Sequence, residues 1–212
     1  ETEYGSDMWI MEKEKGPERY YIRIPGQGFG EGLIVSECSE DITCEAMESL
    51  LRFCKKKALE KKLPYIRLNL HNESPLGQLA HYMGVKMGTP YAWQIKIPDI
   101  PRFLKTITPV LEKRIQNSCF RNFTGTLRFD FYSSAVDWMW KSGTLESILP
   151  AQGECGRKFS LPTDLVPALF LGHRTWHALR ENRPDIFFNS AETAMLIHTL
   201  FPYMRSWIYE QY

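Results

Sequence analysis

The 212-residue chain lacks the features that would place it in or on a membrane. No run of apolar residues approaches the roughly 18 that a transmembrane helix requires. The formal net charge is only +1, so the chain lacks the strong basic excess typical of a general nucleic-acid or anionic-membrane binder. We therefore expect neither nucleic acid nor a membrane among its partners, and we expect a cytoplasmic location.

Cysteines are few and form no recognisable pattern. Their number is odd and no C-x-x-C pair occurs, which is typical of reduced thiols in a cytosolic-type protein. One of them, Cys44, is predicted to begin a helix, where a thiol can become nucleophilic. The neighbouring acids Glu40, Asp41 and Glu45 oppose formation of the thiolate, so a catalytic cysteine is the weaker interpretation.

The usual signatures of hydrolases and metal enzymes are missing as well. No G-x-S-x-G elbow occurs. The stretch "HRTWH" spaces His173 and His177 as zinc ligands would be spaced on a helix, but Arg174 stands where the zincin motif needs Glu. No third ligand stands out, so we predict no metal site.

Two other groups of residues have ordinary interpretations. The acids Asp130, Asp137 and Glu146 lie on predicted strands, but no spacing selects two of them as a catalytic pair, and surface acids are the better interpretation. The aromatic residues Phe129, Phe131, Trp138 and Trp140 recur with the period of a strand, which favours core packing. An apolar ligand cavity beneath that sheet is the alternative.

The chain has 43% hydrophobic residues, enough to bury a sizeable core, and its patterns predict an α+β fold. Residues 1–18 are charged and are expected to form a loose end or an edge segment. Strands are predicted at 19–25, 32–38, 64–71 and 91–98, and helices at 43–62 and 74–84. After a boundary at 98–103 we expect a helix at 103–118, three antiparallel strands within 123–150, helices at 161–172, 173–182 and 190–202, and a strand-like 185–189.

The junction "LIVSECSEDITCEAMESLLRFCKKK" (33–57) runs from an apolar strand into an amphipathic helix. Such junctions often bind phosphate, because the first helical N–H groups are free and the helix dipole favours an anion. Phosphate loops are usually rich in glycine and carry a basic residue, whereas residues 39–45 here include three acids and no glycine. The glycines of "GQGFGEG" (26–32) precede a strand rather than a helix, so they predict a flexible hairpin connection rather than a dinucleotide loop.

Two long segments resemble a known family. "ITCEAMESLLRFCKKKALEKKLPYIRLNLHNESPLGQLAHYMGVKMGTPYAWQIKIPD" looks like the second half of a GNAT N-acetyltransferase fold. "FLKTITPVLEKRIQNSCFRNFTGTLRFDFY", "LVPALFLGHRTWHAL" and "MLIHTLFPYMRSWIYEQY" resemble the sterol-carrier-type domain found at the end of some GNAT proteins. The resemblance covers roughly residues 20–212. It points to the enhanced intracellular survival (Eis) type, in which an active GNAT domain, a degenerate GNAT domain and a sterol-carrier-like domain follow one another.

The resemblance implies that this GNAT-like part is the degenerate one. Active members hold the coenzyme A pyrophosphate with an R-G-x-G-x-G/A motif, and here its arginine position is Ile42 and its glycine positions are Thr43 and Glu45. The family's general-acid tyrosine would fall at Ala80, two residues from Tyr82 and on another face of the helix. Both chemical signatures are therefore missing.

The family layout sets the remaining expectations. Residues 1–100 would form a degenerate, GNAT-like mixed sheet with flanking helices, and residues 101–212 a sterol-carrier-like α/β domain. The chain begins at Glu1 rather than Met, so we expect a fragment whose active GNAT domain lies upstream in the same protein. In Eis-type enzymes the carboxylate of an aromatic C-terminal residue serves as the base, and Tyr212 is the candidate here.

By resemblance, the full protein would transfer acetyl from acetyl-CoA to an amine acceptor and would form a homo-oligomer. This part would shape the acceptor pocket and the subunit contacts, would be inactive alone, and would itself need no cofactor. One alternative is a sterol-carrier-like module that binds a lipid or another apolar ligand. The other is a pseudoenzyme with a structural or interaction role.

Overall fold

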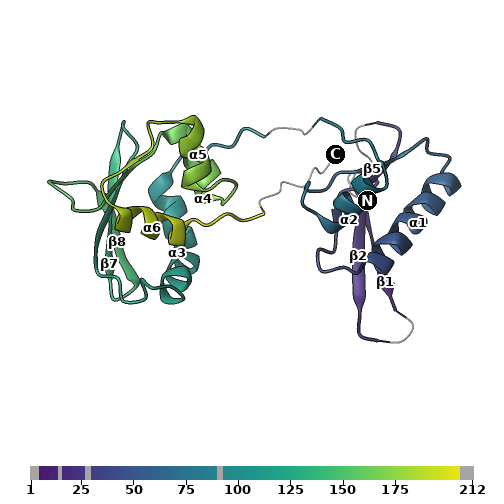
Figure 1. The fold of residues 1–212 in the computed structure, drawn as a ribbon, viewed down its shortest axis with the longest axis horizontal. Coiled ribbons are helices and arrows are strands. Elements are labelled where there is room, and N and C mark those ends of the chain that lie inside the picture. The colour runs from purple at the N-terminus through teal and green to yellow at the C-terminus, as the bar shows by residue number, and fades with distance from the viewer. Residues whose placement is uncertain (1–4, 14–15, 27–29, 90–92, 206–212) are drawn as a thin grey trace. The chain divides into compact units, whose positions relative to one another are not determined.

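The fold is described from a computed structural model, which describes residues 5–13, 16–26, 30–89 and 93–205. The chain divides into two compact units, one within Glu1–Tyr91 and the other within Ala92–Ser206 (Figure 1). This division lies ahead of the boundary predicted between residues 100 and 101. Both units contain helices and β-sheet, which confirms the α+β class. Within the described residues, no helix is both long and apolar enough to span a lipid bilayer.

The first unit combines short strands with two helices. A three-stranded antiparallel sheet has the order β1-β2-β4, and a separate pair joins β3 to β5 in parallel. Its elements are β1 (Ser6–Glu12), β2 (Arg19–Pro25), β3 (Leu33–Val35), β4 (Glu37–Cys38), α1 (Cys44–Glu60), β5 (Ile66–Leu68) and α2 (Pro75–Tyr82).

Side-chain caps fix where both helices of this unit begin. The Thr43 hydroxyl accepts a hydrogen bond from the Ala46 N–H, and the Ser74 hydroxyl accepts one from the Gly77 N–H. Each cap satisfies one of the N–H groups that the first helical turn leaves free. Burial of the apolar face of α1 against the strands then builds the core of this unit, which includes Ile22, Ile24, Leu33, Val35, Met47, Leu50, Cys54 and Leu76.

The second unit places helices on one face of a five-stranded sheet (Figure 1). The strand order is β10-β9-β6-β7-β8, with β6 and β9 parallel and the other neighbours antiparallel. Its elements are α3 (Ile100–Gln116), β6 (Gly125–Asp130), β7 (Ala135–Lys141), β8 (Thr144–Pro150), β9 (Lys158–Ser160), a 3-10 turn (Thr163–Leu165), α4 (Val166–Phe170), α5 (Trp176–Asn182), β10 (Phe187–Phe188) and α6 (Ala191–Leu200).

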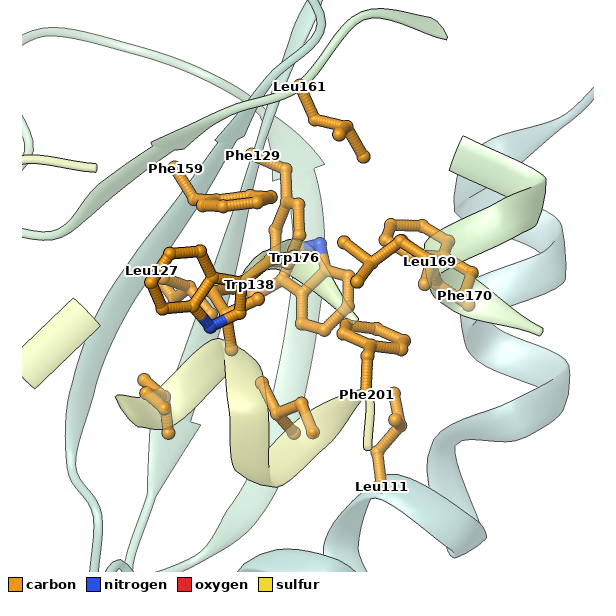
Figure 2. Close-up of a cluster of buried hydrophobic side chains, with 14 of the residues drawn as sticks. Leu111, Leu127, Phe129, Trp138, Phe159, Leu161, Leu169, Phe170, Trp176 and Phe201 are labelled. Atoms are coloured by element: carbon orange, nitrogen blue, oxygen red, sulfur yellow. The ribbon is translucent and has the colours of Figure 1, made fainter. Parts of the chain in front are cut away.

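Aromatic side chains fill the space between that sheet and its helices (Figure 2). Phe129 stacks on Trp138 with ring centroids 4.4 Å apart, and Phe170 stacks on Phe201 at the same separation. Phe159 meets the edge of Phe129 at 5.7 Å. The predicted aromatic stripe is therefore core, because Phe129, Phe131, Trp138 and Trp140 are all buried. Such ring pairs add to the stabilisation that comes from burying their area.

Three sequence predictions need correction. The strand expected at 91–98 is absent from its described part, since residues 93–98 form no regular structure. The strand expected at 32–38 is split at Ser36, whose N–H donates to the Arg23 carbonyl while β3 and β4 pair with different strands. The helix expected at 161–172 begins late, because a 3-10 turn precedes the short α4.

Candidate functional site

The junction between β4 and α1 is where the resemblance places a coenzyme pyrophosphate. Ser39 is already engaged there, since its N–H donates to the Tyr21 carbonyl at 3.0 Å and its Oγ accepts from the Tyr21 N–H at 2.8 Å. These bonds continue the pairing of β2 with β4. The residue that opens the junction, although it lies just beyond β4, is therefore tied to β2 by two hydrogen bonds.

The start of α1 is capped by its own Thr43 and is acidic. Thr43 Oγ1 accepts from the Ala46 N–H at 3.3 Å, and the Thr43 carbonyl accepts from the Met47 N–H at 2.9 Å. Exposed carboxylates surround this end of the helix, supplied by Glu40, Asp41 and Glu45. Their negative charge offsets the attraction of the helix dipole and opposes a pyrophosphate.

The position expected for a general-acid tyrosine is also unsuitable for chemistry. Ala80 is buried in α2, whereas Tyr82 is 88% exposed. The helix ends at the predicted glycine: Gly84 adopts a φ of +83° and the Val85 N–H donates to the Ala80 carbonyl at 3.0 Å. This left-handed ending is one that glycine tolerates well. Tyr212, the candidate base, lies outside the described residues.

The acids considered as a catalytic pair are each held by a different cation. Asp130 pairs with Lys158, Asp137 with Arg128, and Glu146 with Lys141. Hydrogen bonds from Arg128 lower the pKa of Asp137 despite its partial burial. For Asp130, burial acts to raise the pKa, but the Lys158 ammonium and the Tyr132 N–H together lower it. A general acid needs a raised pKa, so Asp130 and Asp137 are suited to structural ion pairs rather than to proton donation.

The histidine spacing does not produce a shared helical face. The helix α5 begins only at Trp176, so His173 precedes it and His177 lies on it. His177 stacks on Trp176, and its ring lies 5.8 Å from that of His198 on α6. Within the described ranges, no group of three or more His, Cys, Asp or Glu residues is placed to hold a metal ion.

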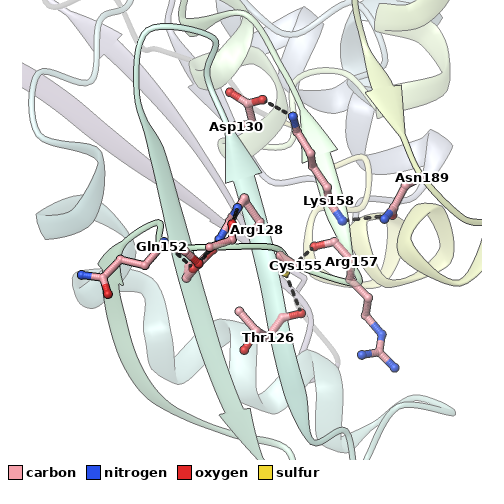
Figure 3. Close-up of polar contacts among 10 residues, drawn as sticks. Thr126, Arg128, Asp130, Gln152, Cys155, Arg157, Lys158 and Asn189 are labelled. Atoms are coloured by element: carbon pink, nitrogen blue, oxygen red, sulfur yellow. Dashed lines mark hydrogen bonds and ion pairs between the residues drawn. The ribbon is translucent and has the colours of Figure 1, made fainter.

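The second unit contains an open depression that the sequence did not indicate. It has a volume of about 450 Å³ and lies between the outer face of the sheet and the loop of residues 150–157 (Figure 3). The Cys155 thiol lies 3.3 Å from the Arg157 carbonyl and 3.7 Å from the Thr126 carbonyl. Its lining mixes both charges with apolar groups: Thr126, Asp137, Met139, Leu149, Pro150, Gln152, Glu154, Cys155, Gly156 and Arg157.

This depression has no arrangement typical of catalysis. The carboxylate of Asp137 is held by Arg128 and the guanidinium of Arg157 by Glu192. Both charged groups are therefore already paired with residues outside the lining. Sequence reasoning could not assemble it, because its residues come from three strands, β6, β7 and β8, and from the loop that follows β8.

The chain matches no family model, no curated protein and no solved structure. Any functional conclusion must therefore rest on the geometry of the β4–α1 junction, of α2 and of the aromatic core of the second unit.

Proposed function

We propose that the chain is a non-catalytic portion of a GNAT-type acetyltransferase that transfers acetyl from acetyl-CoA to an amine. In this role it shapes the acceptor pocket and supplies contacts between subunits, while a separate GNAT domain upstream in the same protein holds the coenzyme. Tyr212 remains the candidate base of that reaction, through its carboxylate. The proposal builds on the resemblance of the sequence and on one observation, the capped and acidic start of α1.

The chemistry explains why that observation matters. A pyrophosphate needs unpaired N–H groups and positive charge at the strand-to-helix junction. Here Thr43 takes the Ala46 N–H, and three exposed acids occupy the neighbourhood. The buried Ala80 also leaves no phenol where the leaving thiolate would need a proton. Both features support a GNAT-like domain that serves as a scaffold and lacks the coenzyme site.

Calorimetric titration of acetyl-CoA into the chain tests the proposal. We expect no binding heat and no acetyl transfer to a panel of amines in a radiolabel assay. The matched variant Ile42→Arg/Thr43→Gly/Glu45→Gly restores the three positions of the pyrophosphate motif, and we expect it to gain measurable affinity. Micromolar binding by the unaltered chain would overturn the proposal.

A second candidate, an apolar-ligand module, is favoured by one feature of the aromatic core. The indole N–H groups of Trp138, Trp140 and Trp176 are buried and have no acceptor among the described residues. Buried donors in native proteins are nearly always satisfied, so a ligand carbonyl or hydroxyl entering the core could accept from one of them. Native mass spectrometry of the purified chain separates the two ideas: a co-purifying apolar molecule supports the module, and a clean mass counts against it.

A further inference from the structure

The outer strand of the first sheet, β1, has one paired edge and one open edge. It pairs with β2 on one side, and no other described strand pairs with it. Two backbone bonds fix which residues face β2: the Gly26 N–H donates to the Gly5 carbonyl at 2.8 Å, and the Lys13 N–H donates to the Glu18 carbonyl at 3.3 Å. Gly5 and Lys13 therefore turn their backbone groups toward β2.

Backbone groups alternate between the two edges of an antiparallel strand, so the rest of β1 follows from those bonds. Odd-numbered residues of β1, such as Trp9, direct their N–H and C=O toward β2. Met8 and Ile10 direct theirs toward the open edge. Met8 and Ile10, on either side of Trp9, therefore present backbone donors and acceptors to the edge where another strand could pair.

The side chains at this edge are apolar and exposed. Met8 is 62% exposed and Ile10 is 63% exposed, and both lie on the face of β1 opposite to Trp9, which packs on Phe53. Natural edge strands are usually protected by lysine, proline or a bulge. The stretch from Met8 to Met11 has none of these, so this edge is suited to pairing.

The sequence of β1 is complementary to itself. Trp9 is the central residue of β1. If two copies of β1 pair antiparallel, with a two-fold axis passing through Trp9, they overlap over all of Ser6–Glu12. In that register Met8 lies opposite the partner's Ile10, as an apolar pair. These are the residues whose backbone groups face the open edge, so they would form the hydrogen-bonded pairs.

Charges agree with the same register. Asp7 would lie opposite the partner's Met11, and Glu12 opposite the partner's Ser6, so no like charges face each other. A two-fold axis makes the same patch serve both subunits, as in most homodimers. We infer that β1 is a homodimerisation edge, at which a second copy of this chain adds its own β1 antiparallel and joins two three-stranded sheets. The β1 edge would supply the contacts between subunits that the proposed function includes. The inference itself depends only on the features of β1.

Sedimentation velocity over a wide micromolar range tests the inference. We expect the unaltered chain to form a concentration-dependent dimer. Ile10→Lys places a charge in the apolar pair of the interface and should leave a monomer at every concentration. The control Val110→Lys alters a half-exposed residue of α3 in the second unit and should leave the dimer unchanged. An unaltered chain that stays monomeric, or a dimer that survives Ile10→Lys, would overturn the inference.

Cross-linking tests the register and does not depend on the fold of the lysine variant. In a background with Cys44→Ser and Cys119→Ser, Met8→Cys and Ile10→Cys are made as separate proteins and then mixed under mild oxidation. Hydrogen-bonded partners lie about 5.5 Å apart between Cα atoms, within disulfide reach. Two copies of Met8→Cys would place their thiol-bearing residues about 9 Å apart, which is too far.

The expected result is a disulfide dimer in the mixture and little in either protein alone. Equal cross-linking in all three samples, or none in the mixture, would contradict the register. The test of the dimer and the test of the proposed function can fail independently. Coenzyme binding would overturn the proposed function without affecting β1, whereas a monomer would overturn the dimer without restoring a coenzyme site.

Discussion

Arg128 and Asp137 face each other on adjacent strands of the second unit and form a two-pronged ion pair. The guanidinium Nε lies 2.7 Å from one carboxylate oxygen and Nη2 lies 2.8 Å from the other. Arg128 also donates to the carbonyls of Gln152 and Gly153, and the Gln152 N–H donates to Asp137 (Figure 3). The pair therefore ties the loop after β8 to the outer face of the sheet.

We predict that Asp137→Asn destabilises the protein by about 1–3 kcal/mol, because a largely buried guanidinium loses its charged partner. Both side chains are little exposed, 13% for Arg128 and 14% for Asp137, so solvent screens them weakly. The control is Glu146→Gln, which removes an exposed pair with Lys141 and should change stability by less than about 1 kcal/mol. Urea unfolding measures the stability of both variants. Equally small losses in both would show that the Arg128–Asp137 pair contributes no more than an exposed ion pair.

The same carboxylates predict how stability depends on pH. The folded pKa values of Asp137 and Asp130 lie below their ordinary value, so the unfolded chain binds their protons more readily. The two carboxylates contribute fully to the free energy of unfolding above about pH 5. This contribution is lost as the pH falls through about 4 and approaches the lowered pKa values of the folded state. Urea unfolding at a series of acidic pH values should show this loss, with a shallower slope in Asp137→Asn. An unchanged slope in the variant would contradict the assignment to Asp137.

The turn between β7 and β8 predicts a strong effect of one methyl group. Gly143 adopts a φ of +79°, and a Cβ there would collide with the Arg121 carbonyl. Gly143→Ala should therefore cost about 1–3 kcal/mol, from the left-handed backbone and the close approach together. Gly156→Ala is the control, because a Cβ at Gly156 meets nothing within 4 Å. Thermal unfolding should show a clear drop in Tm for the first variant only.

Packing in the aromatic core predicts the largest loss. Phe201 is buried and stacks on Phe170, so Phe201→Ala should cost about 3–5 kcal/mol through lost burial and a new cavity. Phe187 on β10 is mostly exposed, and its replacement by alanine should cost less than about 1 kcal/mol. Denaturant unfolding compares the two, and a small loss for Phe201→Ala would mean that the core tolerates open space, as a ligand cavity does.

Local patterns in the sequence predicted most elements of the fold. The alternation of Leu127, Phe129 and Phe131 with polar residues predicted both the strand β6 and its buried face, since strand side chains alternate between faces. The helices predicted at 43–62 and 74–84 correspond to α1 and α2. Alternation and helical spacing depend only on residues close together along the chain, so they can be recognised in the sequence alone.

Features that depend on distant partners were not predictable in this way. Residues 93–98 have the alternation of a strand, but a strand forms only beside another strand, and the described structure places these residues in no sheet. The depression beside Cys155 brings together Thr126 and Leu149, whose proximity follows only from the strand order. The zinc-like spacing of His173 and His177 assumed one continuous helix, and α5 begins between them.

The cysteines differ sharply in environment, and this predicts their reactivity. Burial raises the pKa of Cys38 to about 12, with a further contribution from the nearby Cys54, and burial raises the pKa of Cys54 to about 11. Cys44 and Cys119 are exposed. Because the thiolate is the reactive form, Cys38 and Cys54 should stay unmodified near pH 8 while the two exposed thiols react quickly.

Iodoacetamide labelling followed by peptide mass spectrometry measures each site separately. In the native protein we expect fast labelling at Cys44 and Cys119 and protection at Cys38 and Cys54. Unfolding in guanidinium should expose all of these sites equally, which controls for intrinsic differences between the peptides. Fast native labelling of Cys54 would show that α1 separates readily from the strands. The first unit would then lack the packed core on which its role as a scaffold depends.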